Sequence, residues 1–289
     1  MEKEAQFYKK LPKNVVKCEL CPNFCVIKDG ERGKCKAREN KNGTLIALGY
    51  GKPCSTVLDP IEKKPFADFC PGSKTLTLAV TGCNLACKHC QNWHISQSDI
   101  DSTYHEKRSV NEIIQLAKDL NSKIISFSYT EPTIFYEYMF DIAKLAHENG
   151  MKNTMISNGF INKKPLEKLI PLIDAFNIDL KSIKPEFYEK ICDAKLAPVL
   201  ETLKEIHKSG KHLEVTNLII PGLNDSKEEI KKLITWIIVN LGKETHLHFS
   251  AFYPQYKLSD IPATKAETVI RAAEIAKKLG MKNVYTGNI

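Results

Sequence analysis

Short apolar segments alternate with amphipathic segments from about residue 76 to the end of the chain. The apolar segments predict strands at 76–80, 124–128, 153–157, 175–180, 213–219 and 246–251, with a weaker one at 283–285. The segments between them carry apolar residues at helical spacing, as in residues 110–120. This alternation is typical of a parallel sheet whose helices cover the strands.

Polar residues and glycines mark where several of these helices begin and end. Three Ser/Thr-x-x-Glu motifs predict capping boxes, at Ser109 and Glu112, Ser226 and Glu229, and Thr264 and Glu267. Three glycines predict helix ends, at Gly150, Gly210 and Gly280. Six such βα units predict an open doubly wound sheet or an incomplete (β/α)6 barrel. Either fold places ligand sites at the carboxyl ends of the strands.

The first 74 residues differ in composition from the rest. They are rich in cysteine, lysine and glycine and show no long amphipathic helix, which predicts a small extension held together by a metal. We therefore expect an extension at 1–74 and a barrel domain at 75–289. The charged stretch 59–65 is bracketed by prolines and is expected to be a solvated linker.

Overall composition fits a globular protein with a substantial core. The chain has 289 residues, 43% hydrophobic and 26% charged. It has neither an apolar run of 18 residues nor the apolar core of a secretory signal, so we expect a cytoplasmic protein that does not enter a membrane. Its ten cysteines should then be reduced, which favours metal-binding or catalytic thiols over disulfides.

The net charge of +8 comes mostly from the N-terminal extension, where 15 Lys and Arg face 9 Asp and Glu. Such a bias is more often a lysine-rich solvated surface than a nucleic-acid-binding face, so we expect no nucleic-acid partner.

Three cysteines follow the first predicted strand: Cys83, Cys87 and Cys90. Iron–sulfur clusters usually take four thiolates and structural zinc takes four ligands, whereas a catalytic metal keeps one position open. Three closely spaced thiolates therefore suggest a cubane with one free iron. The alternatives are a zinc site completed by a residue such as His89, or loop cysteines that bind no metal.

The C-x3-C-x2-C spacing directly after the first strand resembles the radical S-adenosylmethionine (SAM) superfamily. The resemblance implies that Cys83, Cys87 and Cys90 hold a [4Fe–4S] cluster whose open iron chelates the amino and carboxylate groups of SAM. It further implies reductive cleavage of SAM to a 5′-deoxyadenosyl radical, which abstracts a hydrogen atom from a substrate. His89, inside the motif, is expected near the cofactor.

The ends of the next strands match family positions that bind SAM. The segment after the second strand is Ser128, Tyr129, Thr130 and Glu131, where relatives carry a Gly-Gly-Glu segment that holds the SAM ammonium. Backbone carbonyls and the Glu131 charge could serve here. The alternative is a plain turn before a helix.

Three further strand ends carry polar candidates, namely Ser157 and Asn158, Asp179 and Lys181, and Asn217. By resemblance, the first pair contacts the SAM ribose or carboxylate, and the third set lies by adenine. Activating enzymes for glycyl-radical enzymes have the same Asp-x-Lys, with the lysine near the SAM carboxylate and the aspartate near the substrate. The alternatives are helix capping for the first pair and a mutual salt bridge for the second.

The remaining candidates are histidines and cysteines. His246 and His248 share one face of the sixth strand and fit a functional pair or packed side chains equally well. In the N-terminal extension, Cys18, Cys21, Cys25 and Cys35 have spacing that favours zinc slightly over a second iron–sulfur cluster. The remaining cysteines have no ligand-like spacing and are interpreted as ordinary small residues, with the alternative that they complete a site in three dimensions: Cys54, Cys70 and Cys192.

The combination of motifs resembles the AmmeMemoRadiSam group, relatives of pyruvate formate-lyase activating enzyme. It implies hydrogen abstraction from a glycine of a partner protein and a reductant such as flavodoxin or ferredoxin. A small-molecule or nucleic-acid substrate is the alternative within the superfamily. An iron–sulfur electron carrier and a zinc-stapled nucleic-acid-binding module are the alternatives outside it.

Overall fold

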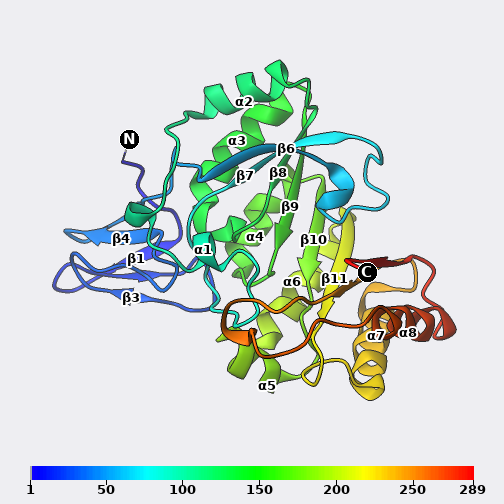
Figure 1. The fold of residues 1–289 in the computed structure, drawn as a ribbon. Helices are drawn as coiled ribbons and strands as arrows, with labels where there is room; N and C mark the ends of the chain where they lie inside the picture. Colours follow the sequence, from blue (N-terminus) through cyan, green and yellow to red (C-terminus); the bar gives the residue numbers. More distant parts are fainter. Residues whose placement is uncertain (1) are drawn as a thin grey trace.

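The computed structural model describes residues 2–289 and contains an eight-stranded sheet with the order β13-β12-β11-β10-β9-β8-β7-β6 (Figure 1). Strands β7 to β13 run parallel, and β6 pairs antiparallel with β7. The strands are β6 (Ser55–Pro60), β7 (Lys74–Ala79), β8 (Ile124–Phe127), β9 (Lys152–Ser157), β10 (Ala175–Asp179), β11 (His212–Ile219), β12 (His246–Ala251) and β13 (Val284–Gly287).

Helices connect the parallel strands and pack on one side of the curved sheet, which stays open between β13 and β6 (Figure 1). The six longer ones are α2 (Val110–Asp119), α3 (Tyr136–Glu148), α4 (Lys163–Leu169), α6 (Leu196–Lys208), α7 (Lys227–Leu241) and α8 (Ala266–Lys278), and the shorter ones are α1 (Trp93–Ser96) and α5 (Pro185–Phe187). The predicted α/β class and partial (β/α)6 barrel are confirmed. Within residues 2–289, no helix is both long and apolar enough to cross a membrane.

The predicted helix ends are confirmed in part. Ser109 and Glu112 form a reciprocal capping box on α2. The three glycines follow α3, α6 and α8 with φ of 70°, 72° and 96°, a left-handed conformation that suits glycine. Ser226 caps α7, but the Glu229 carboxylate turns to Ser182 and Lys184 instead of the cap.

The predicted capping box at Thr264 and Glu267 is wrong. Helix α8 has Lys265 as its N-cap residue. The Thr264 hydroxyl instead donates to the Ile219 carbonyl at 2.6 Å and accepts from the Phe252 amide at 3.1 Å. It ties the ends of β11 and β12 together, because a buried hydroxyl bonds whichever free backbone groups lie beside it.

The N-terminal extension forms two small antiparallel sheets beside α1 and α3 (Figure 1). Their strands are β1 (Tyr8–Leu11), β2 (Val15–Cys18), β3 (Val26–Ile27), β4 (Arg38–Lys41) and β5 (Thr44–Ala47). Arg38 and Glu137 of α3, both fully buried, join this extension to the barrel with an ion pair of 2.5 Å. The Gln6 amide donates to the same carboxylate at 2.7 Å. Removing either charge would leave the other buried and unpaired.

The stretch 59–65 is not a solvated linker as expected. It follows β6, which belongs to the main sheet, and Lys64 is only 2% exposed. The Lys64 ammonium pairs with Asp59 at 2.9 Å and lies 3.7 Å from the centre of the Tyr129 ring. The charges are buried because each has a partner, a condition that sequence composition does not reveal.

Glu214 of β11 fastens the segment after Pro65 to the inner face of the sheet. Its buried carboxylate accepts from the Ala67 and Asp68 amides, from His212 at 2.8 Å and from His248 at 2.5 Å. Burial alone would raise the pKa of Glu214, but the hydrogen bonds from the two histidines outweigh it and lower the pKa to about 2. His248 therefore packs against a structural carboxylate.

We expect Glu214→Gln to lower the free energy of unfolding at pH 7 by about 2 kcal/mol. The folded pKa lies below the ordinary value of 4.5, so the charged carboxylate stabilises the fold above that pH and loses this effect as the pH falls toward 2. Urea unfolding of the variant should therefore depend less on pH between 5 and 2 than that of the unmodified protein. Glu274→Gln, at an exposed position of α8, is the control. Equal losses in both variants would contradict the prediction.

Candidate active site

Cys83, Cys87 and Cys90 lie on the loop that follows β7, at the carboxyl end of the parallel strands. The loop is held at both ends by backbone bonds, from Gly82 to Ile95 at 3.0 Å and from Cys90 to Cys87 at 3.2 Å. Cys87 is buried, whereas Cys83 and Cys90 are partly buried. The three thiols thus lie where the sequence predicts them, at the edge of the sheet that usually carries ligand sites.

The donors around these thiols suit thiolate ligands. Cys83 accepts from the Leu85 amide at 3.4 Å and from the Asn158 side chain at 3.7 Å, and the Ser96 hydroxyl lies 3.1 Å from Cys90. The three sulfurs do not crowd together as tetrahedral zinc ligands do, about 3.8 Å apart. This arrangement fits a cluster in which each thiolate binds a different iron.

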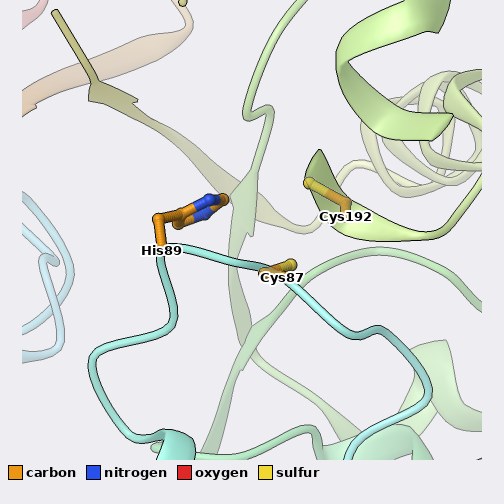
Figure 2. A group of neighbouring side chains, drawn as sticks. All are labelled: Cys87, His89 and Cys192. Atoms are coloured by element: carbon orange, nitrogen blue, oxygen red, sulfur yellow. The ribbon is translucent and has the colours of Figure 1, made fainter. Parts of the chain in front are cut away.

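Cys87 has a neighbour that the sequence did not indicate (Figure 2). Its sulfur, a ring nitrogen of His89 and the Cys192 sulfur lie within 4.8 Å of one another. Cys192 ends the π-helix η5 (Tyr188–Cys192), and its carbonyl accepts from the Ala86 amide at 3.0 Å. π-Helical turns often occur at functional sites. Cys192 is distant in sequence and carries no motif, so its reading as an ordinary small residue missed this contact.

This neighbourhood favours a thiolate at Cys87. The hydrogen bond from the Cys192 thiol lowers the pKa of Cys87, and the Lys181 ammonium acts in the same direction. Burial lowers the pKa of His89 to about 3, so its imidazole is neutral at pH 7. The Nδ1 atom of His89 is buried and has no hydrogen-bond partner among residues 2–289.

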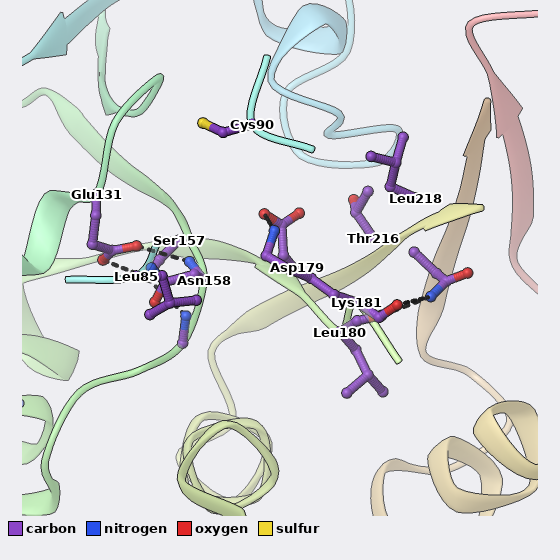
Figure 3. Close-up of polar contacts among 12 residues, drawn as sticks. Leu85, Cys90, Glu131, Ser157, Asn158, Asp179, Leu180, Lys181, Thr216 and Leu218 are labelled. Atoms are coloured by element: carbon purple, nitrogen blue, oxygen red, sulfur yellow. Dashed lines mark hydrogen bonds and ion pairs between the residues drawn. The ribbon is translucent and has the colours of Figure 1, made fainter. Parts of the chain in front are cut away.

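Glu131 connects the ends of β8 and β9 (Figure 3). Its carboxylate accepts from the Ser157 hydroxyl at 2.7 Å, the Asn158 amide at 2.9 Å and the Thr133 amide at 2.9 Å. It is 1% exposed, and burial raises its pKa. Glu131 therefore positions the two predicted residues of β9, which leaves it less free to contact a ligand than expected.

Tyr129 adopts the backbone conformation of a glycine, with φ of 66°. Its hydroxyl donates to Asp59 at 2.6 Å, and its carbonyl accepts from the Asn92 side chain at 2.7 Å. The buried Asp59 and Lys64 pair thus anchors a strained residue where relatives carry glycine. Beside it, Ser128 is buried and the Thr130 hydroxyl donates to the Val80 carbonyl at 2.7 Å.

Asp179 and Lys181 point to the same side at the end of β10 (Figure 3). They form an ion pair of 2.8 Å, which is the alternative reading of this motif. Burial alone would lower the pKa of Lys181, but Asp179 and Cys87 outweigh it and raise the pKa. The Asp179 side chain is 34% exposed, so the pair leaves a carboxylate oxygen accessible at the open end of the barrel.

The side chain of Asn217 bonds backbone groups of its own chain. Its side chain donates to the carbonyls of Leu180 at 2.8 Å and Lys181 at 3.2 Å, and it is 2% exposed. It fixes the turn after β10 and leaves ligand contact in this region to neighbouring backbone groups. Asn177 shows the same use of an asparagine, because it donates to the Pro65 carbonyl.

Asn84 is a further residue that the sequence reading did not single out. It is fully buried, donates to the Phe160 carbonyl at 2.8 Å and accepts from the Asn158 side chain at 2.9 Å. Its own carbonyl accepts from Asn23 of the N-terminal extension at 2.8 Å. The four N-terminal cysteines together line one cavity beside this contact, and they are Cys18, Cys21, Cys25 and Cys35.

Comparison with known proteins agrees with this geometry. Residues 78–237 match the family model of the radical SAM superfamily. The chain is 50% identical over 287 residues to the uncharacterized protein MJ0808 of Methanocaldococcus jannaschii, covering 99% of this chain and 85% of that one. It is 25% identical over 223 residues to the pyruvate formate-lyase-activating enzyme of Clostridium pasteurianum, covering 72% and 92%.

The fold is also found among solved structures. A radical SAM methyltransferase from Sphaerobacter thermophilus superposes with a TM-score of 0.57 at 14% identity, over 76% of this chain and 67% of that one. At this identity the likeness establishes the fold alone.

We expect Gly82→Ala to destabilise the protein far more than Gly72→Ala. A Cβ atom at Gly82 would lie 2.5 Å from the Cys35 carbonyl oxygen, so the N-terminal extension or the cysteine loop must move. Gly72 also has a positive φ, of 77°, but nothing lies within 4 Å of its Cβ position. Urea unfolding should show a loss of about 1 kcal/mol for Gly72→Ala and about 3 kcal/mol or more for Gly82→Ala. Equal losses would mean that the close approach is not a tight constraint.

Proposed function

The chain belongs to the radical SAM superfamily, and from that premise we propose that Cys83, Cys87 and Cys90 bind the [4Fe–4S] cluster with which it cleaves SAM. The observation that carries the proposal is their position. The three thiols lie on the loop after β7, at the carboxyl ends of the parallel strands, and Cys83 and Cys90 have hydrogen-bond partners beside their sulfurs. Three thiolates leave one iron of a four-iron cluster without a protein ligand.

When bound, the reduced cluster supplies one electron that splits SAM into methionine and a 5′-deoxyadenosyl radical able to abstract a hydrogen atom. The residues of this chain would bind and orient SAM and shield it from water. Lys181 provides a buried positive charge for the SAM carboxylate, held in place by Asp179 at 2.8 Å. Ser157 and Asn158 lie at the end of β9, where Glu131 positions them, and their side chains also accept from the Gly159 and Phe160 amides, so they would order the cofactor site from its wall.

Backbone carbonyls of the segment of Ser128, Tyr129 and Thr130 would bind the SAM ammonium, alongside the bonds that the Ser128 and Tyr129 carbonyls already accept from Thr130 and Asn92. The left-handed φ of Tyr129 keeps the turn that glycines provide in relatives, which supports this assignment. Asn217 does not contact the cofactor in this proposal. Its side chain donates to the Leu180 and Lys181 carbonyls and so fixes the turn that carries Lys181. His89 packs against the cluster loop as a neutral side chain.

For the substrate, we propose a glycine of a partner protein. The similarity to the pyruvate formate-lyase-activating enzyme over 72% of the chain supports this class. The exposed Asp179 carboxylate at the open end of the barrel fits a polypeptide whose amide groups approach from outside. A low-potential electron carrier such as flavodoxin or ferredoxin supplies the electron.

We expect Cys87→Ala to lose the [4Fe–4S] cluster proposed at Cys83, Cys87 and Cys90, and with it all reductive SAM cleavage, while the barrel stays folded. One thiolate is removed from a site that has only three, whereas a small residue fits the buried position. Anaerobic measurement of 5′-deoxyadenosine with dithionite as the reductant tests the activity, and circular dichroism tests the fold. Cys70→Ala, at a partly buried cysteine outside the site, is the control. Retained cleavage in Cys87→Ala would refute the assignment.

We expect the abstracted hydrogen to come from protein-bound glycine. Cells of the source organism grown on glycine deuterated at its α-carbon would supply a labelled protein fraction and a labelled small-molecule fraction. The reduced enzyme and SAM should produce deuterated 5′-deoxyadenosine with the protein fraction, together with a glycyl-radical signal in electron paramagnetic resonance. Deuterium transfer from the small-molecule fraction alone would overturn the choice of a protein substrate.

A further inference from the structure

We infer that Cys18, Cys21, Cys25 and Cys35 hold a second [4Fe–4S] cluster, and that it passes an electron toward the first cluster through Asn84. The site itself is independent of the proposed function, whereas its role as an electron relay rests on it. Four features of the molecule support this inference: a shared cavity, donors to two of the sulfurs, the separation of the sulfurs, and a short covalent and hydrogen-bonded connection to Cys83.

The four cysteines enclose one cavity although they span β2, the loop after it and the turn before β4. Most of the other lining is apolar and comes from Leu20, Phe24, Ile27 and Ile134. Ile134 belongs to the barrel, so the cavity forms where the extension meets the main domain. An apolar shell with convergent thiols excludes water from a metal centre and is typical of iron–sulfur sites.

Two of the four sulfurs accept a hydrogen bond from nitrogen. The donors are the Arg38 guanidinium for Cys18 at 3.8 Å and the Lys34 amide for Cys25 at 3.5 Å. A neutral thiol is a weak acceptor, and a fold has little reason to aim buried donors at such thiols. Metal-bound thiolates carry the negative charge that these donors satisfy.

The separation of the sulfurs favours a cluster over zinc. Tetrahedral zinc binds thiolates at about 2.3 Å and holds them about 3.8 Å from one another. Within residues 2–289, the one group of three potential ligands that lies within 4.8 Å is Cys87, His89 and Cys192. No three of the N-terminal sulfurs therefore lie within 4.8 Å of one another, and neither do the three of the first site. A cubane separates its thiolates because each one binds a different corner iron.

Asn84 connects the two sites. Its backbone continues directly from Cys83, a proposed ligand of the first cluster. The side chain of Asn23, two residues after Cys21, donates to the Asn84 carbonyl at 2.8 Å, and the Cys35 carbonyl packs against Gly82. One hydrogen bond and a few covalent bonds of the chain thus connect the second site to the first.

The relay transfers one electron at a time, which a one-electron donor protein such as flavodoxin or ferredoxin supplies. The donor loses one electron, and the second cluster takes it and passes it on, so that the first cluster gains one electron and the second returns to its oxidised state. Cys25 is partly buried next to Phe24, which is 44% exposed and lies beside the Lys17 ammonium. This edge gives a donor access to the second site at the surface.

The first experiment counts clusters. The anaerobically prepared protein should contain about eight iron and about eight sulfide per chain, and Cys21→Ser or Cys25→Ser should contain about four of each. Cys70→Ser is the matched control and should keep all of them. Cys87→Ala should retain the N-terminal cluster with its Mössbauer signature, whether or not the protein cleaves SAM. About four iron in the unmodified protein, or one zinc per chain lost in Cys21→Ser, would overturn the second cluster.

The second experiment separates a relay from a structural role. With reduced flavodoxin as the donor, SAM cleavage by Cys21→Ser should fall at least about tenfold, whereas with dithionite, which diffuses to the first site, it should stay within about twofold. The Cys21→Ser protein should also keep the change in the electron paramagnetic resonance spectrum that SAM causes at the first cluster. Equal loss with both reductants, or no loss with either, would overturn the relay.

Discussion

The close approach of two backbones at Gly82 is the constraint on which the arrangement of both cysteine sites depends. The Cys35 carbonyl oxygen occupies the space that any side chain at position 82 would need. Because this residue directly precedes Cys83, the cysteine loop and the N-terminal extension are fixed relative to each other at that point. The buried Arg38 and Glu137 pair fixes the other side of the extension, on α3. Asn84 can therefore bond Asn23 of the extension and Asn158 of the barrel at the same time.

The open end of the barrel is organised by carboxylates that bind other residues of the chain. Glu131 satisfies a hydroxyl and two amides, and Asp179 holds Lys181. Both carboxylates sit where a ligand would otherwise be expected to meet them. Each sets the position of a neighbouring group that can meet the ligand, and Asp179 in addition keeps its side chain 34% exposed. Such positioning residues keep a polar site ordered before anything binds.

Sequence patterns could predict the parts of this structure that depend on neighbours along the chain. Local periodicity and spacing predict the parallel strands, the capping box at Ser109 and the position of the cysteine loop after β7. The parts that failed depend on distant partners. Thr264 caps no helix because free backbone groups of β11 and β12 lie closer, and the ion pair of Asp59 and Lys64 in the stretch 59–65 is buried because Tyr129 covers it. Cys192 meets Cys87 only through the fold.

The two cysteine sites use the same electrostatic solution. Each places one buried cation beside a thiol, Lys181 beside Cys87 and Arg38 beside Cys18. Each cation is held by a carboxylate, Asp179 or Glu137, so it cannot turn away to solvent. A reduced cluster carries one more negative charge than an oxidised one, and a fixed cation in a region of low dielectric constant stabilises it more. In the clusters proposed for the two sites, these cations would offset part of the extra negative charge of the reduced state, which is the state that reductive SAM cleavage requires.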